Sequence, residues 1–590
     1  MRGDLTGFFW PLAAYAKQSI YDYGQIPLWN RYMLGGTPLA TDPQAPIFYL
    51  PNILHLIFPA GAAFLILYIL HILIGAVGMY FLAKYLKLNK YAATLTAILY
   101  CLSPNLSRYV DAGHVGLVYT WGYLPFVYLA TLKLADTQKN KHAIYLAISL
   151  SGLFYTHTVT FAISAISTLP LYLIKLAQNR SKLFALRQYV LSAMLTFGLI
   201  APILVLQLRW QSQTNRGFLL ANPETFPIWH GKLQFLAASI NPLFHPDGIT
   251  NIDTEKFIAL GMGVLLLAFV GYIKLKSKLK IYFTVLFFVL ALISLNNASP
   301  VYNLFLKIDY FVLFRVATRF WFLATIASVL LAAYGYQLLS KKHKYLANTL
   351  AMAAVLELGL ISGVRIARPV AQEANVPESV YEYLATNTKG RVFCTTKCFS
   401  PIKVVEHKLE TIEGYSTLIQ KNYWRRAFVM MNTNWPDKYS LSIPPFFILS
   451  SEQLQPHALY LGEYAVDYVV SPHELTDPNL VLETQIDNYL IYKNILNKGY
   501  AYFENGDTPK SIWLSPNRLV YEFSGDQSGK LTLAEVYSPG WKAYLDGKQV
   551  VITETAEALR SVDISRGSKK LVLVYKLKYM LFHSETVFKQ

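Results

Sequence analysis

The sequence predicts a polytopic α-helical membrane protein that carries a mixed, strand-rich domain at its carboxyl end. Apolar stretches of about 20 residues, long enough to cross roughly 30 Å of hydrocarbon, recur through residues 1 to 369. This part holds 30 Lys/Arg but only 11 Asp/Glu, whereas residues 370 to 590 hold 23 and 24. The net charge of +18 therefore belongs to the first part, where it indicates loop topology rather than nucleic-acid binding.

About ten membrane crossings account for the apolar stretches. We predict them at 61–83, 91–107, 116–134, 143–157, 158–176, 188–208, 257–273, 281–296, 316–339 and 345–364. The stretch 143–176 is read as two short helices around Thr156-His157, because basic clusters on both sides of it must lie on the same side of the membrane.

Seventeen of the basic residues fall in five short clusters, which membrane insertion retains in the cytoplasm. They are Lys84/Lys87/Lys90, Lys133/Lys139/Lys141, Lys175/Arg180/Lys182/Arg187, Lys274/Lys276/Lys278/Lys280 and Lys341/Lys342/Lys344. The intervening loops and both chain ends are then extracytoplasmic. Because such an amino terminus has no signal peptide, we expect one further helix before Met1 in the intact gene product; the alternative is a short translocated tail.

Four regions follow: a first extracytoplasmic loop at 1–60, a helix bundle at 61–368, an extracytoplasmic mixed α/β region at 369–510, and a β-sandwich-like domain at 511–590. In the last two we expect a helix near 377–387 and, in 518–523 and 570–575, alternating strands. Asp546-Gly547 predicts a hairpin, because the turn needs positive φ at both central positions.

The outer regions offer two cysteines but no recognisable soluble-enzyme motif. Cys394 and Cys398 are close enough for a small disulfide loop or two free thiols, either of which fits better than zinc. The sequence has no phosphate-binding glycine loop, nucleophile elbow or zinc-binding His pair. A divalent cation stays possible as a cofactor, because outer acids could hold one, but no ligand spacing requires it.

The acids of the membrane part lie mainly outside. Nine of the 11 fall in outer loops: Asp4, Asp22, Asp42, Asp111, Glu224, Asp247, Asp253, Glu255 and Asp309. The first outer loop is also dense in Gly, Pro, Trp and Tyr, with runs at 2–5, 24–30, 35–39 and 48–51. This composition predicts an ordered site at the membrane interface, with aromatic side chains at headgroup depth.

These runs resemble the first loop of the YfhO-type family of bacterial membrane proteins, which has an early Gly-Asp, a Pro-Leu-Trp-Asn stretch, a Gly-Gly-x-Pro-Leu turn and a Tyr-x-Pro helix entry. Residues 314–320 and 537–548 match that family as well. The resemblance implies a GT-C fold glycosyltransferase that takes a sugar from a polyprenyl-phosphate lipid donor. Its acceptor would be an extracytoplasmic glycan, lipid or protein, and Asp4 would inherit the role of general base.

The remaining site residues follow from their chemistry. Arg315 and Arg319 are predicted to share one face of a helix and grip the donor phosphate with their forked guanidinium groups; the alternative is that they anchor the helix at the interface.

Four residues of the outer loops complete the predicted substrate-binding set. Asp42 either contacts substrate or caps a turn beside Pro43. Arg108, Asp111 and His114 share one short outer loop that either binds acceptor or metal or is simply polar. His157 and Glu357 are left outside the predicted site.

Two other functions remain open. A lipid or polysaccharide transporter would have a similar number of helices, but its spans should be more polar and show repeat symmetry. A non-catalytic protein of the plasma membrane could use the outer sandwich to bind envelope glycans. A test of covalent sugar transfer separates both from the enzyme.

Overall fold

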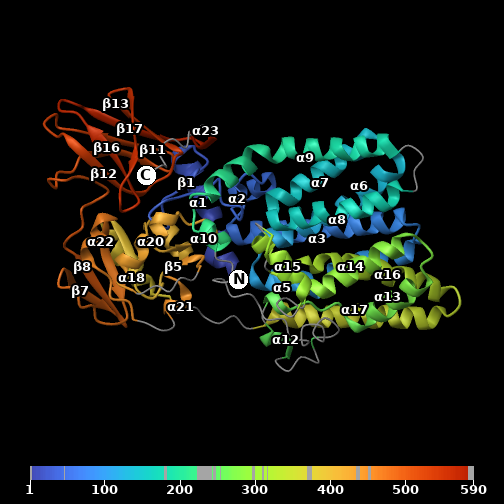
Figure 1. Ribbon diagram of the computed structural model, residues 1–590. Coiled ribbons are helices and arrows are strands. Elements are labelled where there is room, and N and C mark those ends of the chain that lie inside the picture. The colour runs from blue at the N-terminus through green and yellow to red at the C-terminus, as the bar shows by residue number, and fades with distance from the viewer. Residues whose placement is uncertain are drawn as a thin grey trace. The chain divides into compact units, whose positions relative to one another are not determined.

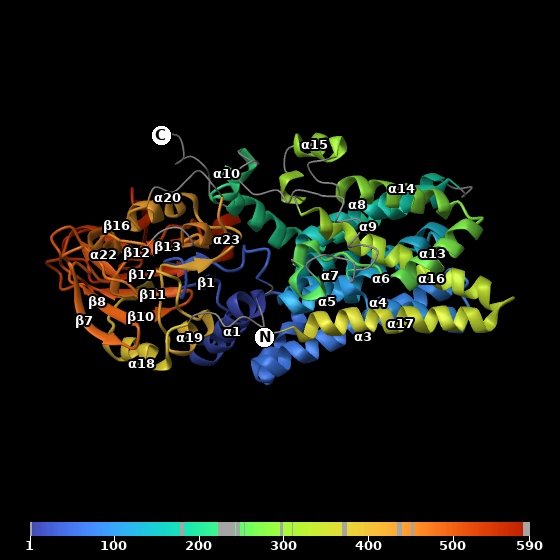
Figure 2. The same cartoon turned by 90° about the horizontal axis from the view of Figure 1, so that it is seen from below.

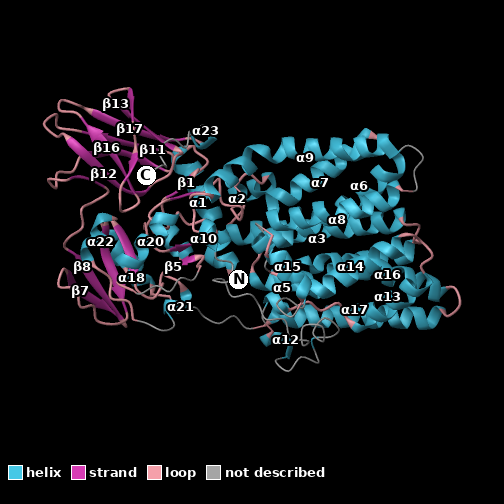
Figure 3. Cartoon of the chain, in the orientation of Figure 1, coloured by secondary structure: helices cyan, strands magenta, loops and turns pink. Residues whose placement is uncertain are grey.

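The computed structural model describes residues 3–45, 47–177, 182–221, 242, 248–252, 254–294, 299–308, 311–314, 316–368, 375–433, 439–449 and 453–581. The chain divides into two compact units. Unit 1 comprises Met1–Leu5, Phe48–Pro202 and Pro227–Ala371, and unit 2 comprises Thr6–Ile47, Ile203–Phe226 and Gln372–Gln590. Unit 1 is helical and unit 2 contains the extended sheets (Figure 3).

Unit 1 is a bundle of apolar helices that run side by side (Figures 1 and 2). Its helices are α2 (Leu54–Ile57), α3 (Ala60–Tyr85), α4 (Lys90–Cys101), α5 (Pro104–Ala112), α6 (Val115–Thr137), α7 (Asn140–Thr156), α8 (Thr158–Leu176), α9 (Lys182–Gln211, which continues into unit 2), α12 (Gly248–Asn251), α13 (Met262–Lys274), α14 (Leu279–Ser294), α15 (Pro300–Leu306), α16 (Trp321–Ser340) and α17 (Lys344–Ala367). Among the described residues six helical stretches are long and apolar enough to span a membrane: 60–85, 115–137, 158–176, 183–211, 318–340 and 344–367. The chain is therefore a multi-pass membrane protein.

The helix boundaries confirm one feature of the predicted crossings and correct another. The stretch 143–176 does form two helices, α7 and α8, which meet at His157. The crossing predicted at 91–107 is not one continuous helix, because α4 ends at Cys101 and α5 begins at Pro104. Proline has no backbone N–H to continue the first helix, and Ser103 caps the second by accepting a hydrogen bond from the Asn105 N–H.

Glu357, an acid in the middle of apolar α17, has a structural explanation. Its Oε1 accepts a hydrogen bond from the Met262 N–H (2.7 Å), and its Oε2 accepts one from the Gly263 N–H (2.8 Å). These N–H groups stand at the start of α13, where the helix has no internal acceptors and its dipole favours negative charge. Glu357 therefore caps a neighbouring helix.

Unit 2 combines short helices with three larger sheets. Its helices are α1 (Trp10–Tyr23, preceded by a π-helical turn at Leu5–Phe9), α10 (Arg216–Ala221), α18 (Glu378–Asn387), α19 (Pro401–Glu406), α20 (Lys421–Met430), α21 (Phe446–Leu449), α22 (Ala458–Glu463) and α23 (Leu577–Leu581). A mixed sheet has the order β3 (Arg391–Cys394), β6 (Val466–Ser471), β8 (Tyr489–Asn494), β7 (Leu480–Ile486), with β3 and β6 parallel. Two short pairs join β1 (Trp29–Asn30) to β2 (Thr37–Pro38) and β4 (Gly414–Tyr415) to β5 (Ser442–Ile443). The helix predicted near 377–387 is thus confirmed as α18.

The carboxyl-terminal part of unit 2 is a β-sandwich of two antiparallel sheets. One sheet has the order β10 (Lys510–Ser515), β11 (Arg518–Glu522), β17 (Lys570–Tyr575), β13 (Trp541–Leu545), β14 (Lys548–Val550). The other has the order β15 (Thr553–Glu554), β16 (Leu559–Ile564), β12 (Gly529–Val536), β9 (Ala501–Phe503). Alternate side chains of both sheets form one core, as the period of two requires. The predicted hairpin is confirmed: β13 pairs with β14, and Asp546 and Gly547 have φ of 48° and 83°.

The aromatic side chain at the centre of the first loop lies elsewhere than predicted. Trp29 is completely buried in the core of the sandwich, where its ring contacts Trp541 edge to face at 5.7 Å and Tyr575 at 5.4 Å. The expectation that it sits at lipid headgroup depth is wrong, because unit 2 supplies a dry aromatic pocket that buries more of the ring. Gly36 faces this ring so closely that a Cβ there would lie 2.5 Å from Trp29 Cζ2.

Cys394 and Cys398 form a disulfide, which decides between the two alternatives that their spacing left open. The bond closes a short loop after β3, within a core cluster of unit 2.

Candidate functional site

Asp4 lies against the end of α5 in unit 1. Gly3 has a φ of 51°, and a Cβ on it would stand 2.5 Å from the carbonyl oxygen of Ala112, so this close approach requires glycine. Gly113 ends α5 in the left-handed conformation, which directs the chain to His114. The Asp4 Oδ2 and His114 Nε2 are 3.3 Å apart, with 34% of the Asp4 side chain and 18% of the His114 side chain exposed.

A second acid, Glu255, faces Arg319 in the same region. The Arg319 Nη2 donates to the Glu255 Oε1 at 2.9 Å. Burial raises the pKa of Glu255, but the positive charge of Arg319, with those of His114 and Arg108, outweighs burial and lowers the pKa to about 2. Glu255 is therefore a carboxylate at any physiological pH, and it holds the guanidinium in place.

Asp4 has the opposite electrostatic balance. Burial raises its pKa more than the charges of His114 and Arg319 lower it, and the negative charge of Glu255 raises it further. The result is one strongly acidic carboxyl and one less acidic carboxyl in the same cluster. That separation of pKa values is the arrangement in which one carboxyl can accept a proton while the other stays charged.

Two further side chains complete this cluster. His157, at the junction of α7 and α8, interacts electrostatically with Arg319, His114 and Glu255. The hydroxyl of Tyr68 on α3 is buried, interacts electrostatically with Asp4, and has no hydrogen-bond partner among the residues that the structure describes. We call Asp4, Tyr68, His114, His157, Glu255 and Arg319 the acidic cluster of unit 1.

The sequence predicts Arg108 and Asp111 in a short outer loop, but both lie on α5. Ser103, Pro104 and Gly113 delimit this helix. Both side chains are fully buried and have internal partners. Arg108 donates to the carbonyl oxygens of Thr254 (3.4 Å) and Thr318 (2.9 Å), which connects the segments that carry Glu255 and Arg319.

Asp111 pairs with two arginines at the end of α17, Arg365 and Arg368, at 2.9 and 2.8 Å. Arg365 also donates to the carbonyl oxygens of Ile249 and Ile252, and its Nη2 donates to the hydroxyl of Thr254 at 3.0 Å. These contacts hold Ile249, Ile252 and Thr254, which precede Glu255, against α5 and α17.

Of the two predicted phosphate-binding arginines, Arg319 lies among the described residues. It lies in a 3-10 turn, Ala317–Phe320, and α16 begins at Trp321, so the shared helix face stays a prediction. Arg315 lies outside the described residues. Arg319 is in the acidic cluster.

Asp42 belongs to unit 2. It is buried, its Oδ1 accepts hydrogen bonds from the Gln44 N–H (2.8 Å) and the Thr417 hydroxyl (3.1 Å), and its Oδ2 accepts one from the Ser416 hydroxyl (3.0 Å). Burial raises its pKa, while these hydrogen bonds lower it. The Gln44 bond is an Asx turn, as the capping alternative predicts.

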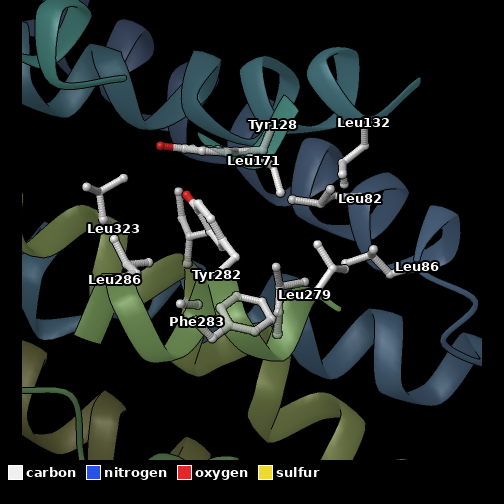
Figure 4. Close-up of a pocket in the computed structure, with 13 residues that line it drawn as sticks. Leu82, Leu86, Tyr128, Leu132, Leu171, Leu279, Tyr282, Phe283, Leu286 and Leu323 are labelled. Carbon is white, nitrogen blue, oxygen red and sulfur yellow. The ribbon is translucent and has the colours of Figure 1, made fainter. Parts of the chain in front are cut away.

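An apolar crevice lies within the helix bundle of unit 1 (Figure 4). Its cavity volume is about 40 Å³, and it is lined by residues of α3, α6, α8, α14 and α16. Leu323, four residues after Arg319, lies at one end and Leu86 at the other, while the rings of Tyr128 and Tyr282 face it from opposite sides. The lining is hydrocarbon except for these two tyrosines.

Sequence reasoning missed Glu255 and His157 as members of the site. Glu255 was recognised only as one of nine outer acids, and what distinguishes it, the pairing with Arg319, joins residues 64 apart in sequence. No group of three or more His, Cys, Asp or Glu residues within the described ranges could hold a metal ion.

The fold is similar to that of an arabinofuranosyltransferase of solved structure. The arabinofuranosyltransferase AftD from Mycobacteria aligns with a TM-score of 0.50 and 12% identity over 84% of this chain, which spans 38% of AftD. ArnT from Cupriavidus metallidurans, solved with undecaprenyl phosphate, aligns with a TM-score of 0.45 and 10% identity over 86% of this chain and 96% of ArnT. The oligosaccharyltransferase AglB from Archaeoglobus fulgidus was solved in complex with an inhibitory peptide and a dolichol-phosphate. It aligns with a TM-score of 0.40 and 12% identity over 79% of this chain and 66% of AglB.

The likeness to AftD shows a GT-C-like fold, as the sequence predicts. No protein-family model and no curated protein matches this chain.

Proposed function

We propose that this chain is an integral membrane glycosyltransferase of the YfhO type, which transfers a sugar from a polyprenyl-phosphate donor to an extracytoplasmic glycan, lipid or protein. The observation that carries the proposal is the acidic cluster. A carboxyl of raised pKa, Asp4, lies beside an imidazole, while Arg319 is held nearby by a carboxylate of low pKa. The GT-C-like fold is consistent with the reaction.

In the proposed reaction Asp4 acts on the acceptor and Arg319 acts on the leaving group. An acceptor hydroxyl oxygen attacks the anomeric carbon of the donor sugar, and Asp4 takes the hydroxyl proton. The bond between the anomeric carbon and the phosphate oxygen breaks, and the electron pair leaves with the polyprenyl phosphate. Arg319 stabilises the charge on that leaving group, in the position that Glu255 fixes.

Other predicted residues would support this site without touching the reacting atoms. Arg108 and Asp111 position the segments that carry Glu255 and Arg319. Asp42, together with Ser416 and Thr417, would orient the first loop within unit 2.

The crevice of Figure 4 would take the hydrocarbon tail of the donor. Leu323, at one end of the crevice, is four residues from Arg319, so we expect a tail attached to a phosphate at Arg319 to enter at that end. Its leucine lining is chemically matched to an isoprenoid chain and could not solvate a charged group.

The proposed orientation puts unit 2 and the acidic cluster outside the cytoplasm. The lysine-rich turns α3–α4, α6–α7, α13–α14 and α16–α17 lie at one end of the bundle (Figure 1). His114 immediately precedes α6 and Arg319 precedes α16, at the opposite ends of those helices, and Asp4 pairs with His114. Positive turns are retained inside. The disulfide in unit 2 fits an oxidising outer compartment.

The test is sugar transfer by the full chain in lipid nanodiscs. The assay offers a panel of polyprenyl-phosphate sugars together with membranes from cells lacking the gene, which supply acceptors, and mass spectrometry detects labelled product. We expect Asp4→Asn to slow transfer about 10²- to 10⁴-fold, the usual contribution of a general base. Asp22→Asn is the matched control, because Asp22 pairs with Lys408 at the surface of unit 2.

Two results contradict the proposal. Transfer at the same rate in the Asp4 variant removes the proposed base. Movement of a lipid-linked sugar across the bilayer without any covalent product favours the transporter instead.

A further inference from the structure

Unit 2 contains an open cleft that is lined by none of the residues assigned to the reaction proposed for unit 1. It lies between the carboxyl end of α9, the start of α20 and the β-sandwich strands β13 to β15. Its cavity volume is about 1230 Å³. Sites for single small molecules usually have about 300 to 1,000 Å³. The cleft is therefore large enough for several units of a chain.

The charge of the cleft is positive. Arg209 from α9, Lys421 and Arg425 from α20, and Lys542 from β13 line it, and Glu554 is the one acid among its described lining residues. The Glu554 Oε1 already accepts hydrogen bonds from the side-chain amides of Gln420 (2.8 Å) and Asn422 (2.7 Å).

This concentration of charge is local. The part of the chain from residue 370 onward has 23 basic and 24 acidic residues. The positive charge of the cleft therefore results from the placement of its basic residues and not from an excess of them in this part of the chain. Such a cleft attracts an anionic ligand through the summed field of its charges, and the two arginines can form forked hydrogen bonds with carboxylate or phosphate groups.

The uncharged part of the lining suits a saccharide. Hydroxyl and amide groups of Ser212, Gln213, Gln549 and Thr553 can exchange hydrogen bonds with sugar hydroxyls. Beside them is an apolar strip that includes Val551, which is 75% exposed, and offers contact to the C–H faces of sugar rings.

The same lining disfavours a single-stranded nucleic acid. Bases bind by stacking on exposed aromatic rings. The aromatic residues of this cleft, Tyr537 and Trp541, are buried in the protein, so their ring faces are not available for stacking.

We propose that this cleft binds a segment of an anionic saccharide chain, one that carries carboxylate or phosphate groups. If the chain is the transferase proposed above, this saccharide is the acceptor, or a part of it. The binding itself does not depend on that function, because all the residues that line the cleft are in unit 2.

The experiment measures binding of two hexasaccharides to the full chain in zwitterionic lipid nanodiscs by isothermal titration calorimetry. Hexagalacturonate carries the carboxylates, and maltohexaose is its uncharged counterpart. The variant is Lys421→Gln/Arg425→Gln, which removes two positive charges of the cleft. The control is Arg566→Gln/Lys569→Gln, which removes two exposed positive charges of the sandwich outside the cleft.

We expect hexagalacturonate to bind at least about tenfold more tightly than maltohexaose, and added salt to weaken that binding. The cleft variant should lose about tenfold or more in affinity while the control keeps the affinity of the unaltered chain. Equal binding of the two hexasaccharides, equal loss in both variants, or no binding overturns the proposal.

Two further arms identify the source of any signal. Nanodiscs containing phosphatidylglycerol test a lipid headgroup: if the cleft charges affect only association with this anionic lipid, the saccharide proposal is overturned. The Asp4→Asn variant should bind hexagalacturonate like the unaltered chain, so a failure of the proposed catalysis and a failure of the proposed binding give different results.

Discussion

Replacing Glu255 by glutamine tests the electrostatic structure of the acidic cluster. The carboxylate lies 2.9 Å from the Arg319 Nη2, and the pKa of Glu255 falls from its ordinary value of 4.5 to about 2. That lowering corresponds to about 3 kcal/mol of preference for the charged form in the folded protein. The side chain is only 14% exposed, so solvent screens little of this interaction.

The stability from Glu255 has a defined pH dependence. Because its folded pKa is lower than its unfolded pKa, its contribution is fully present above about pH 4.5 and is lost as the pH falls toward about 2. At pH 7 we expect Glu255→Gln to lower the free energy of unfolding by up to about 3 kcal/mol, since Arg319 then lacks its counter-charge. The difference between the variant and the unaltered chain should shrink below pH 4.5.

The assay is thermal unfolding in detergent, followed by tryptophan fluorescence, at a series of pH values from 7 to 3. Glu504→Gln is the control, because Glu504 is an exposed glutamate of unit 2. An Arg319→Gln variant and the double variant complete a cycle that isolates the pair. Equal unfolding temperatures for Glu255→Gln and the control at pH 7, or a difference that does not change on acidification, would refute the reasoning.

Two other substitutions test the packing of unit 2 and the tail crevice. Trp29→Ala should destabilise unit 2 by about 3 to 5 kcal/mol, because it leaves a cavity between Trp541 and Tyr575, and limited proteolysis should then cut the sandwich faster than in Trp29→Phe. Leu286→Trp should fill the crevice and raise KM for a long-chain polyprenyl donor about tenfold while leaving KM for a short-chain analogue unchanged. Equal effects on the two donors would place the tail elsewhere.

The class of the fold could be predicted because its signals are local. The lysine-rich turns and apolar stretches predict the bundle, and the alternating patterns predict β11 and β17. Asp546-Gly547 predicts its hairpin because two adjacent residues determine the turn. The break between α4 and α5 was also encoded locally, in Ser103-Pro104, but the high hydropathy of 91–107 concealed it.

The candidate site could be predicted only in part, because its pairs join distant residues. Asp4 and His114 were both recognised, but only the fold brings them together, at the end of α5. Glu255 and Arg319 come from separate segments. Trp29 was read as an interface residue because its pocket, formed by Trp541 and Tyr575, lies more than 500 residues further along the chain.

The central claim is that the Asp4 carboxylate accepts the proton of the acceptor hydroxyl. The most direct test is the pH dependence of the transfer rate for the unaltered chain and for Asp4→Asn. Since only the carboxylate can act as a base, the rate should rise with pH through the pKa of Asp4, at a midpoint above the ordinary value of 3.8. The asparagine variant should be slow and lack this rise; the same rise in both proteins would contradict the claim.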